Sequence, residues 1–208
     1  MKRFSLLILF PVLFFSCDDQ ADHPKGVVDS QARKLNDRAC MLTRSGKNED
    51  IQQAIGMLDQ ATKIDSNYFT AYWNKLAFLD KLKEYDRALA TAKELNRLKP
   101  NDPVFYVTIG TFYQRKNDSV TANTYFQNAM THFNAALDTL SPQGRHYDFL
   151  LMNKGIDLIM LGKMKEGNDI LQQLYDSHSD STFRKTVSFY MNKDKKEIVD
   201  SLENNHTR

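Results

Sequence analysis

The chain has 208 residues, of which 41% are hydrophobic and 26% are charged, and it contains two cysteines. These values are ordinary for a globular protein and argue against wholesale disorder, while two cysteines cannot by themselves form a disulfide scaffold or a four-ligand zinc site. Lys2 and Arg3 are the only charged residues among the first sixteen, and the other 192 residues contain 26 basic and 26 acidic side chains. A neutral chain lacks the basic excess that drives nucleic-acid binding, so no nucleic-acid partner is expected.

The first residues have the features of a secretory signal peptide. Lys2 and Arg3 precede an apolar run over residues 4–15, which is too short to span a bilayer as a helix. The five residues that end at Cys17, Leu-Phe-Phe-Ser-Cys, resemble the lipobox of bacterial lipoproteins. In that family the cysteine is acylated and the signal peptide is cut immediately before it.

The lipobox resemblance implies a division of this end of the chain. It implies a signal peptide over residues 1–16, lipidation of Cys17, and a polar tether over residues 17–28. The chain is then expected to be exported and lipid-anchored to a bacterial membrane, periplasmic or surface-exposed, with the outer membrane favoured over the inner. The alternative is a soluble secreted protein in which Cys17 is free or paired with Cys40.

An internal repeat follows, because Ala54, Ala88 and Ala122 are each 34 residues apart. The clearest copy places aromatic, apolar and small residues at i, i+3, i+4 and i+7, the spacing of one helix face, and then begins a second helix. Its residues are Tyr106, Ile109, Gly110, Tyr113, Ala122 and Phe126. This pattern resembles the tetratricopeptide repeat, a pair of antiparallel helices. Gly110 and Ala122 are expected to lie where these two helices touch.

The repeat resemblance implies an all-α fold, a right-handed solenoid of about four helix pairs over residues 29–181. Between the third and fourth copies the period lengthens from 34 to 45, so the sixth helix is expected to run about two turns longer. Residues 182–208 are expected to form capping helices and a tail. The four helix pairs are placed at about residues 30–66, 69–102, 103–134 and 148–181.

Catalytic and metal-binding motifs are missing from the sequence. It contains none of the motifs typical of zinc proteases, serine hydrolases, P-loop enzymes or dinucleotide-binding domains. The five histidines are scattered, and none is three or four residues from another histidine or a cysteine. The sequence therefore predicts no enzyme, no cofactor and no metal site.

In the tetratricopeptide family, the first helices line a surface that receives peptides or helices of other proteins. Transfer by position makes this surface polar and basic at its start and apolar at its end. The version that holds a C-terminal carboxylate is not predicted, because only Asn74 matches one of its required positions. The assigned residues are Arg33, Asn36, Arg44, Trp73, Lys81, Gln114, Arg115, Phe149, Met152, Ile156 and Met160.

Two interpretations of the apolar end remain open. It can be a socket for an amphipathic helix, with Trp73 as a further anchor. Alternatively, the C-terminal helices fold back and cover residues 149–160, and this interpretation is the favoured one.

The leading functional hypothesis is a membrane-anchored scaffold or assembly factor whose partner is an envelope protein or peptide. The alternative is a ligand-binding or immunity-type protective lipoprotein with one specific partner.

Overall fold

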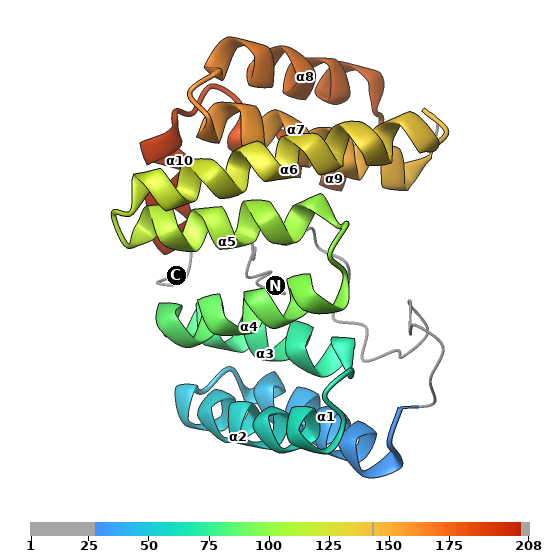
Figure 1. Cartoon of the computed structure of the whole chain (residues 1–208), viewed down its shortest axis with the longest axis vertical. Coiled ribbons are helices and arrows are strands. Elements are labelled where there is room, and N and C mark those ends of the chain that lie inside the picture. Colours follow the sequence, from blue (N-terminus) through green and yellow to red (C-terminus); the bar gives the residue numbers. More distant parts are fainter. Residues whose placement is uncertain (1–27, 143, 205–208) are drawn as a thin grey trace. The chain divides into compact units, whose positions relative to one another are not determined.

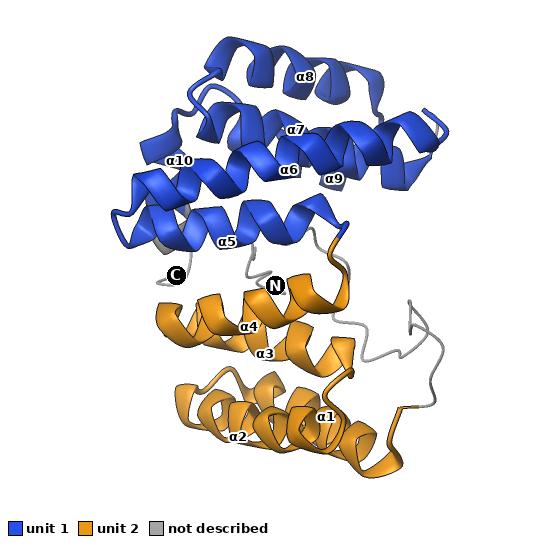
Figure 2. Cartoon of the chain, viewed as in Figure 1, with its two compact units in different colours: residues 1–12, 101–208 blue, residues 13–100 orange. Residues whose placement is uncertain are grey.

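The computed structural model of the chain describes residues 28–142 and 144–204 (Figure 1). These residues contain ten α-helices and one short 3-10 helix, and no β-strand occurs among them. They form two compact units, an N-terminal unit of residues 28–100 and a C-terminal unit of residues 101–204 (Figure 2). The expected signal peptide, the lipidation site at Cys17 and most of the expected tether lie outside the described residues. None of the described helices is both long and apolar enough to cross a bilayer.

The N-terminal unit consists of two antiparallel helix pairs. α1 packs on α2, α3 packs on α4, and α2 packs on α3. Asp59 on α2 joins the pairs, because its carboxylate forms ion pairs with Lys75 on α3 at 2.6 Å and Arg87 on α4 at 3.0 Å. The helices are α1 (Ser30–Leu42), α2 (Asn48–Ile64), α3 (Phe69–Lys81) and α4 (Tyr85–Leu98).

Local signals explain where the first pair begins and turns. Asp29 caps α1, because its side chain accepts hydrogen bonds from the backbone N–H groups of Gln31 at 2.8 Å and Ala32 at 3.1 Å. After α1 the chain forms the 3-10 helix η1 (Thr43–Ser45) and turns at Gly46, whose φ of +74° suits glycine. The 3-10 helix makes the connection between α1 and α2 longer than the connections inside the later helix pairs.

The C-terminal unit contains two further helix pairs and a terminal pair of shorter helices. α5 packs on α6, α7 on α8 and α6 on α7, while α9 packs on α8 and α10 on α5. α6 has 21 residues and is the longest described helix, as the lengthened period indicates. The helices are α5 (Pro103–Arg115), α6 (Ser119–Thr139), α7 (Arg145–Met160), α8 (Met164–Ser177), α9 (Ser181–Tyr190) and α10 (Lys195–Asn204).

The repeat is also visible in the backbone of the turns. Lys83, Asn117 and Gly162 each have a positive φ, of +60°, +61° and +82°, between the two helices of a pair. In each turn the next N–H bonds to the carbonyl five residues earlier, which is the bond that closes a Schellman motif. These bonds run from Glu84 to Leu79, from Asp118 to Tyr113 and from Lys163 to Leu158, at 2.9, 3.0 and 2.8 Å. The all-α prediction of tetratricopeptide-type helix pairs with a C-terminal capping segment is therefore confirmed.

Glycines mark where paired helices approach closely. A Cβ built on Gly110 would lie 2.6 Å from Cε1 of Phe126 on α6, so α5 and α6 approach closely at Gly110. In the next pair, Gly167 on α8 lies against the backbone of Gly155 on α7. A Cβ at Gly167 would meet backbone atoms of α7, whereas one at Gly110 would press on the Phe126 ring.

Candidate protein-interaction surfaces

The apolar residues assigned to the end of the binding surface belong to the core of the C-terminal unit. Met152, Ile156 and Met160 on α7 are all buried. They share one hydrophobic cluster with residues of α9 and α10, among them Tyr190 and Ile198. This burial agrees with the favoured interpretation, in which the C-terminal helices cover residues 149–160, and it corrects the assignment of Met152, Ile156 and Met160 to an open binding surface.

The remaining assigned residues of the C-terminal unit are only partly accessible. Phe149 is half-buried against the same cluster and its ring stacks with that of His146, with the centroids 6.5 Å apart. Gln114 and Arg115 are half-buried at the end of α5. They line a cleft that includes residues of α10.

Asn36 in the N-terminal unit is not available to a partner either. Its side chain is 0% exposed, and its Oδ1 accepts a hydrogen bond of 2.8 Å from Nδ2 of Asn74 on α3. The same Nδ2 lies 3.3 Å from Sγ of the buried Cys40. Asn36, Asn74 and Cys40 therefore join α1 to α3, and the placement of Asn36 on a binding surface is corrected.

Four assigned residues of the N-terminal unit remain at its surface. Arg33 and Arg44 are exposed, while Trp73 and Lys81 are partly exposed. They lie on α1, on the 3-10 helix that follows it and on α3, and α1 and α3 are in contact. We call these four residues the first-helix surface.

Trp73 is part of a small aromatic cluster on α3. Its ring stacks with that of Phe69, with the centroids 6.1 Å apart and the planes inclined by 19°. The ammonium group of Lys99 lies 4.4 Å from the centroid of the Phe69 ring. Trp73 is thus the large, partly exposed aromatic residue of the first-helix surface, and the other three residues of this set are cationic.

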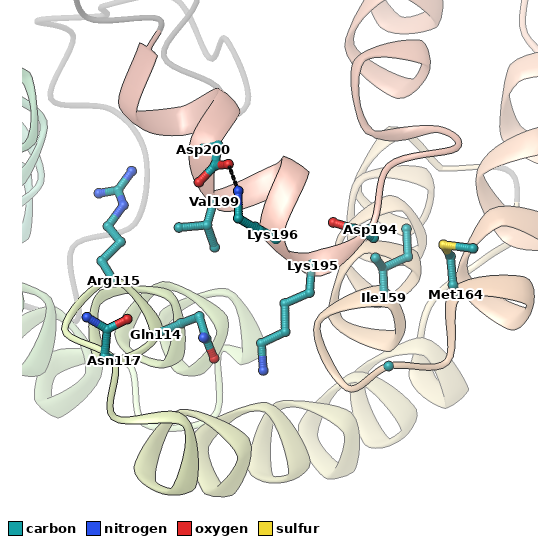
Figure 3. Close-up of a pocket in the computed structure, with 11 residues that line it drawn as sticks. Gln114, Arg115, Asn117, Ile159, Met164, Asp194, Lys195, Lys196, Val199 and Asp200 are labelled. Atoms are coloured by element: carbon teal, nitrogen blue, oxygen red, sulfur yellow. Dashed lines mark hydrogen bonds and ion pairs between the residues drawn. The ribbon is translucent and has the colours of Figure 1, made fainter.

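A cleft of about 840 Å³ lies within the C-terminal unit (Figure 3). Its walls come from the end of α5, the turn between α7 and α8, and the first turns of α10. We call it the α10 cleft. Its lining residues are Gln114, Arg115, Asn117, Ile159, Gly162, Met164, Asp194, Lys195, Lys196, Val199 and Asp200.

The two lysines of the α10 cleft differ in their surroundings. Lys196 forms an ion pair of 2.6 Å with Asp200. Lys195 instead donates a 3.2 Å hydrogen bond to the side-chain oxygen of Asn123, and its ammonium lies 5.4 Å from the centroid of the Phe126 ring. Burial lowers the pKa of Lys195, because removing its ammonium from water disfavours the charged form.

The sequence did not identify Lys195 and Lys196 as candidate site residues, because two lysines near the C-terminus resemble a solvated cap. One signal was nevertheless present. Both lysines follow Asp194 at the start of a helix, where the macrodipole disfavours positive charge.

One cluster contains the residue types of a catalytic triad but not its hydrogen-bonding arrangement. It consists of Ser177, His178 and Asp148. His178 Nε2 is 3.0 Å from Asp148 Oδ2, and His178 Nδ1 is 3.1 Å from Ser177 Oγ. However, Nδ1 also faces the Leu174 carbonyl oxygen at 2.9 Å, and a carbonyl can only accept. Both ring nitrogens of His178 thus face acceptor oxygens of other residues, so neither is placed as a base for Ser177, and the cluster joins the end of α8 to α7.

Asp157 is the described carboxyl with the most strongly perturbed pKa. It is fully buried on α7, and neither of its oxygens has a hydrogen-bond partner among the described residues. Burial raises the pKa of Asp157 to about 8, since no neighbouring charge compensates the cost of desolvation. Within residues 28–142 and 144–204, no group of three or more His, Cys, Asp or Glu side chains is placed to hold a metal ion.

Comparison with known proteins links the fold to solved tetratricopeptide structures. No protein-family model matches the chain, and no curated protein matches it. It is similar to PilW, described as a widely conserved type IV pilus biogenesis factor, with a TM-score of 0.54, 16% identity, and coverage of 86% of this chain and 78% of PilW. It is also similar to a double mutant of MamA RS-1, with a TM-score of 0.52, 13% identity, and coverage of 86% and 94%. At these identities the likeness shows the fold, which is of the tetratricopeptide type.

Proposed function

We propose that this chain is a lipid-anchored protein of the bacterial cell envelope that holds or assembles another envelope protein through its first-helix surface. The observation that carries the binding role is Trp73, partly exposed and stacked on Phe69. Tryptophan and arginine are enriched among the residues that dominate protein interfaces, and the first-helix surface offers Trp73 together with Arg33 and Arg44.

The fold supports a role in protein interaction. Stacked helix pairs of the tetratricopeptide type offer an extended concave surface to other proteins, and PilW, which shares this fold, is described as a pilus biogenesis factor. The likeness concerns the fold, and the assembly role is our proposal for this chain. Such a role needs no catalytic group, and we propose none.

The proposed anchor rests on the sequence of residues 1–17. Two or three acyl chains on one cysteine hold a protein to a membrane stably, whereas a single chain does not. Cys17→Ser should therefore move the protein from the membrane fraction to the soluble fraction and abolish incorporation of labelled fatty acid. Full membrane partition of this variant, without an acyl label, would contradict the anchor.

The binding role is tested by photocrosslinking in cells. A crosslinking amino acid at position 73 should capture one envelope protein, identified by mass spectrometry. Position 90 is the matched control, because Ala90 is exposed on α4, outside the first-helix surface. The same adducts at both positions, or none at position 73, would contradict the proposal. Capture only of a protein made by neighbouring cells would favour the protective alternative.

A further inference from the structure

We propose that the α10 cleft binds an acidic segment of a partner protein, with Lys195 holding a carboxylate. This inference extends the proposed scaffold role to a second site, in the C-terminal unit. Figure 3 shows Lys195 extending into the cleft between Gln114 on one side and Ile159 and Met164 on the other.

Lys195 lacks an ionic partner in a site where one is favourable. Among the described residues its only hydrogen bond is to the neutral Asn123, and no carboxylate forms an ion pair with it. Lys196, its neighbour in the chain, is already paired with Asp200. A carboxylate brought into the cleft would therefore compensate the desolvation of Lys195 rather than that of Lys196.

The nearby acidic residues are committed to capping α10. Asp194 Oδ1 accepts from the Glu197 N–H at 2.8 Å, and Glu197 Oε2 accepts from the Asp194 N–H at 2.8 Å. This reciprocal pair is a capping box, which holds both carboxylates against the backbone. These two carboxylates therefore serve the start of α10, and neither forms an ion pair with Lys195 among the described residues.

The apolar part of the lining favours a peptide over a small inorganic anion. Ile159, Met164 and Val199 line the cleft together with the two lysines. Apolar side chains of a peptide can pack on this surface, whereas phosphate has none to offer.

The same cleft offers both cationic and apolar contacts. The guanidinium of Arg115 lines it beside Gln114, and Met164 contributes a side chain that is 47% exposed. Methionine adapts its shape to different apolar groups. The fitting ligand is therefore a segment in which acidic residues alternate with apolar ones.

The test uses the mature chain with Cys17→Ser, so that it stays soluble, and an array of eight-residue peptides. Half of the peptides alternate Leu or Phe with Asp and Glu, and the other half carry Asn and Gln at the acidic positions. At least one acidic peptide should bind about tenfold more tightly than its amide analogue, and this preference should weaken as salt is raised.

Two variants localise the binding. Lys195→Gln should weaken binding of the acidic peptide about tenfold, whereas Lys196→Gln, which removes the neighbouring and already paired cation, should change it less than about twofold. Bound peptide should also slow reductive methylation of Lys195 relative to Lys196 in the unmutated chain, which keeps the test valid if a variant misfolds.

Equal binding of acidic and amide peptides, no binding of either, or equal effects of the two variants would overturn the proposal. Binding of inorganic phosphate at Lys195 without any peptide binding would overturn the peptide assignment. If the α10 cleft binds no acidic peptide, capture of an envelope protein at position 73 is still expected. If the scaffold role is wrong, that capture is lost even when acidic peptides bind.

Discussion

The packing of α7 against α8 can be tested by adding one methyl group at Gly167. A Cβ built there would collide with the backbone carbonyl oxygen of Gly155 and lie 2.7 Å from Cγ1 of Ile159. Backbone atoms cannot rotate away as a side chain does, so Gly167→Ala forces α7 and α8 apart. Gly56 on α2 is the matched control, because a Cβ there meets no atom within 4 Å.

The two substitutions should shift the free energy of unfolding in opposite directions. Alanine is favoured over glycine inside a helix by about 1 kcal/mol, so Gly56→Ala should stabilise by roughly 0.5–1 kcal/mol. At Gly167 the same propensity gain is opposed by overpacking, which typically costs about 1–3 kcal/mol and more against rigid atoms. We expect Gly167→Ala to destabilise by about 1–2 kcal/mol.

Urea unfolding of the mature chain, followed by circular dichroism, measures both changes. Because Gly56 and Gly167 lie in different units, hydrogen exchange of each unit shows where stability is gained or lost. A Gly167→Ala variant at least as stable as the unmutated chain would refute the close contact between α7 and α8. A destabilised Gly56→Ala would refute the open space on α2.

Three further substitutions test separate features. Lys83→Gly should stabilise by about 1 kcal/mol in thermal unfolding, because φ of +60° strains a non-glycine residue, and an unchanged melting temperature would contradict this. Asn74→Ala should cost about 1–3 kcal/mol in urea, since it leaves the buried Asn36 oxygen without its donor; a neutral result would contradict that bond. Burial raises the pKa of Asp157 to about 8, so its carboxyl is protonated in the folded chain and ionised when unfolded above about pH 4. The free energy of unfolding should therefore fall by roughly 1 kcal/mol per pH unit between pH 5 and 8 and level off above pH 8. The Asp157→Asn variant should lack this slope. Equal pH profiles for the variant and the unmutated chain would contradict the raised pKa.

The helix pairs could be predicted because each local signal agrees with the fold. The 34-residue spacing of Ala54, Ala88 and Ala122 reports helix packing, which depends on residue size along the chain. The change of period to 45 between the third and fourth copies likewise predicts the long α6, since the added residues must lengthen a helix or a turn.

Which faces are covered could not be decided from the sequence. Met152 and Ile156 have the same helical spacing whether they meet a partner or the chain's own α9 and α10. Asn36 appears accessible by position, yet it is buried because Asn74, 38 residues away, supplies its hydrogen bond. Burial of this kind depends on contacts between distant residues, whereas periodicity reports only the face of one helix.

The α10 cleft was missed for a related reason. Lys195 and Lys196 are identical in type and adjacent in sequence, and only the fold shows that Asp200 pairs with Lys196 while Lys195 faces Asn123. The first-helix surface could likewise be identified only from the exposure of its side chains in the fold. Trp73 is its largest apolar side chain.

The central claim, that Trp73 anchors a partner protein, is tested most directly by calorimetry with the envelope protein captured at position 73. The purified mature chain should bind it, and Trp73→Ala should raise Kd at least about thirtyfold, the effect of losing a dominant interface residue. Val120→Ala is the control, because Val120 is 81% exposed on α6 of the other unit, and its Kd should be unchanged. Equal affinities for the unmutated chain and Trp73→Ala would contradict the claim.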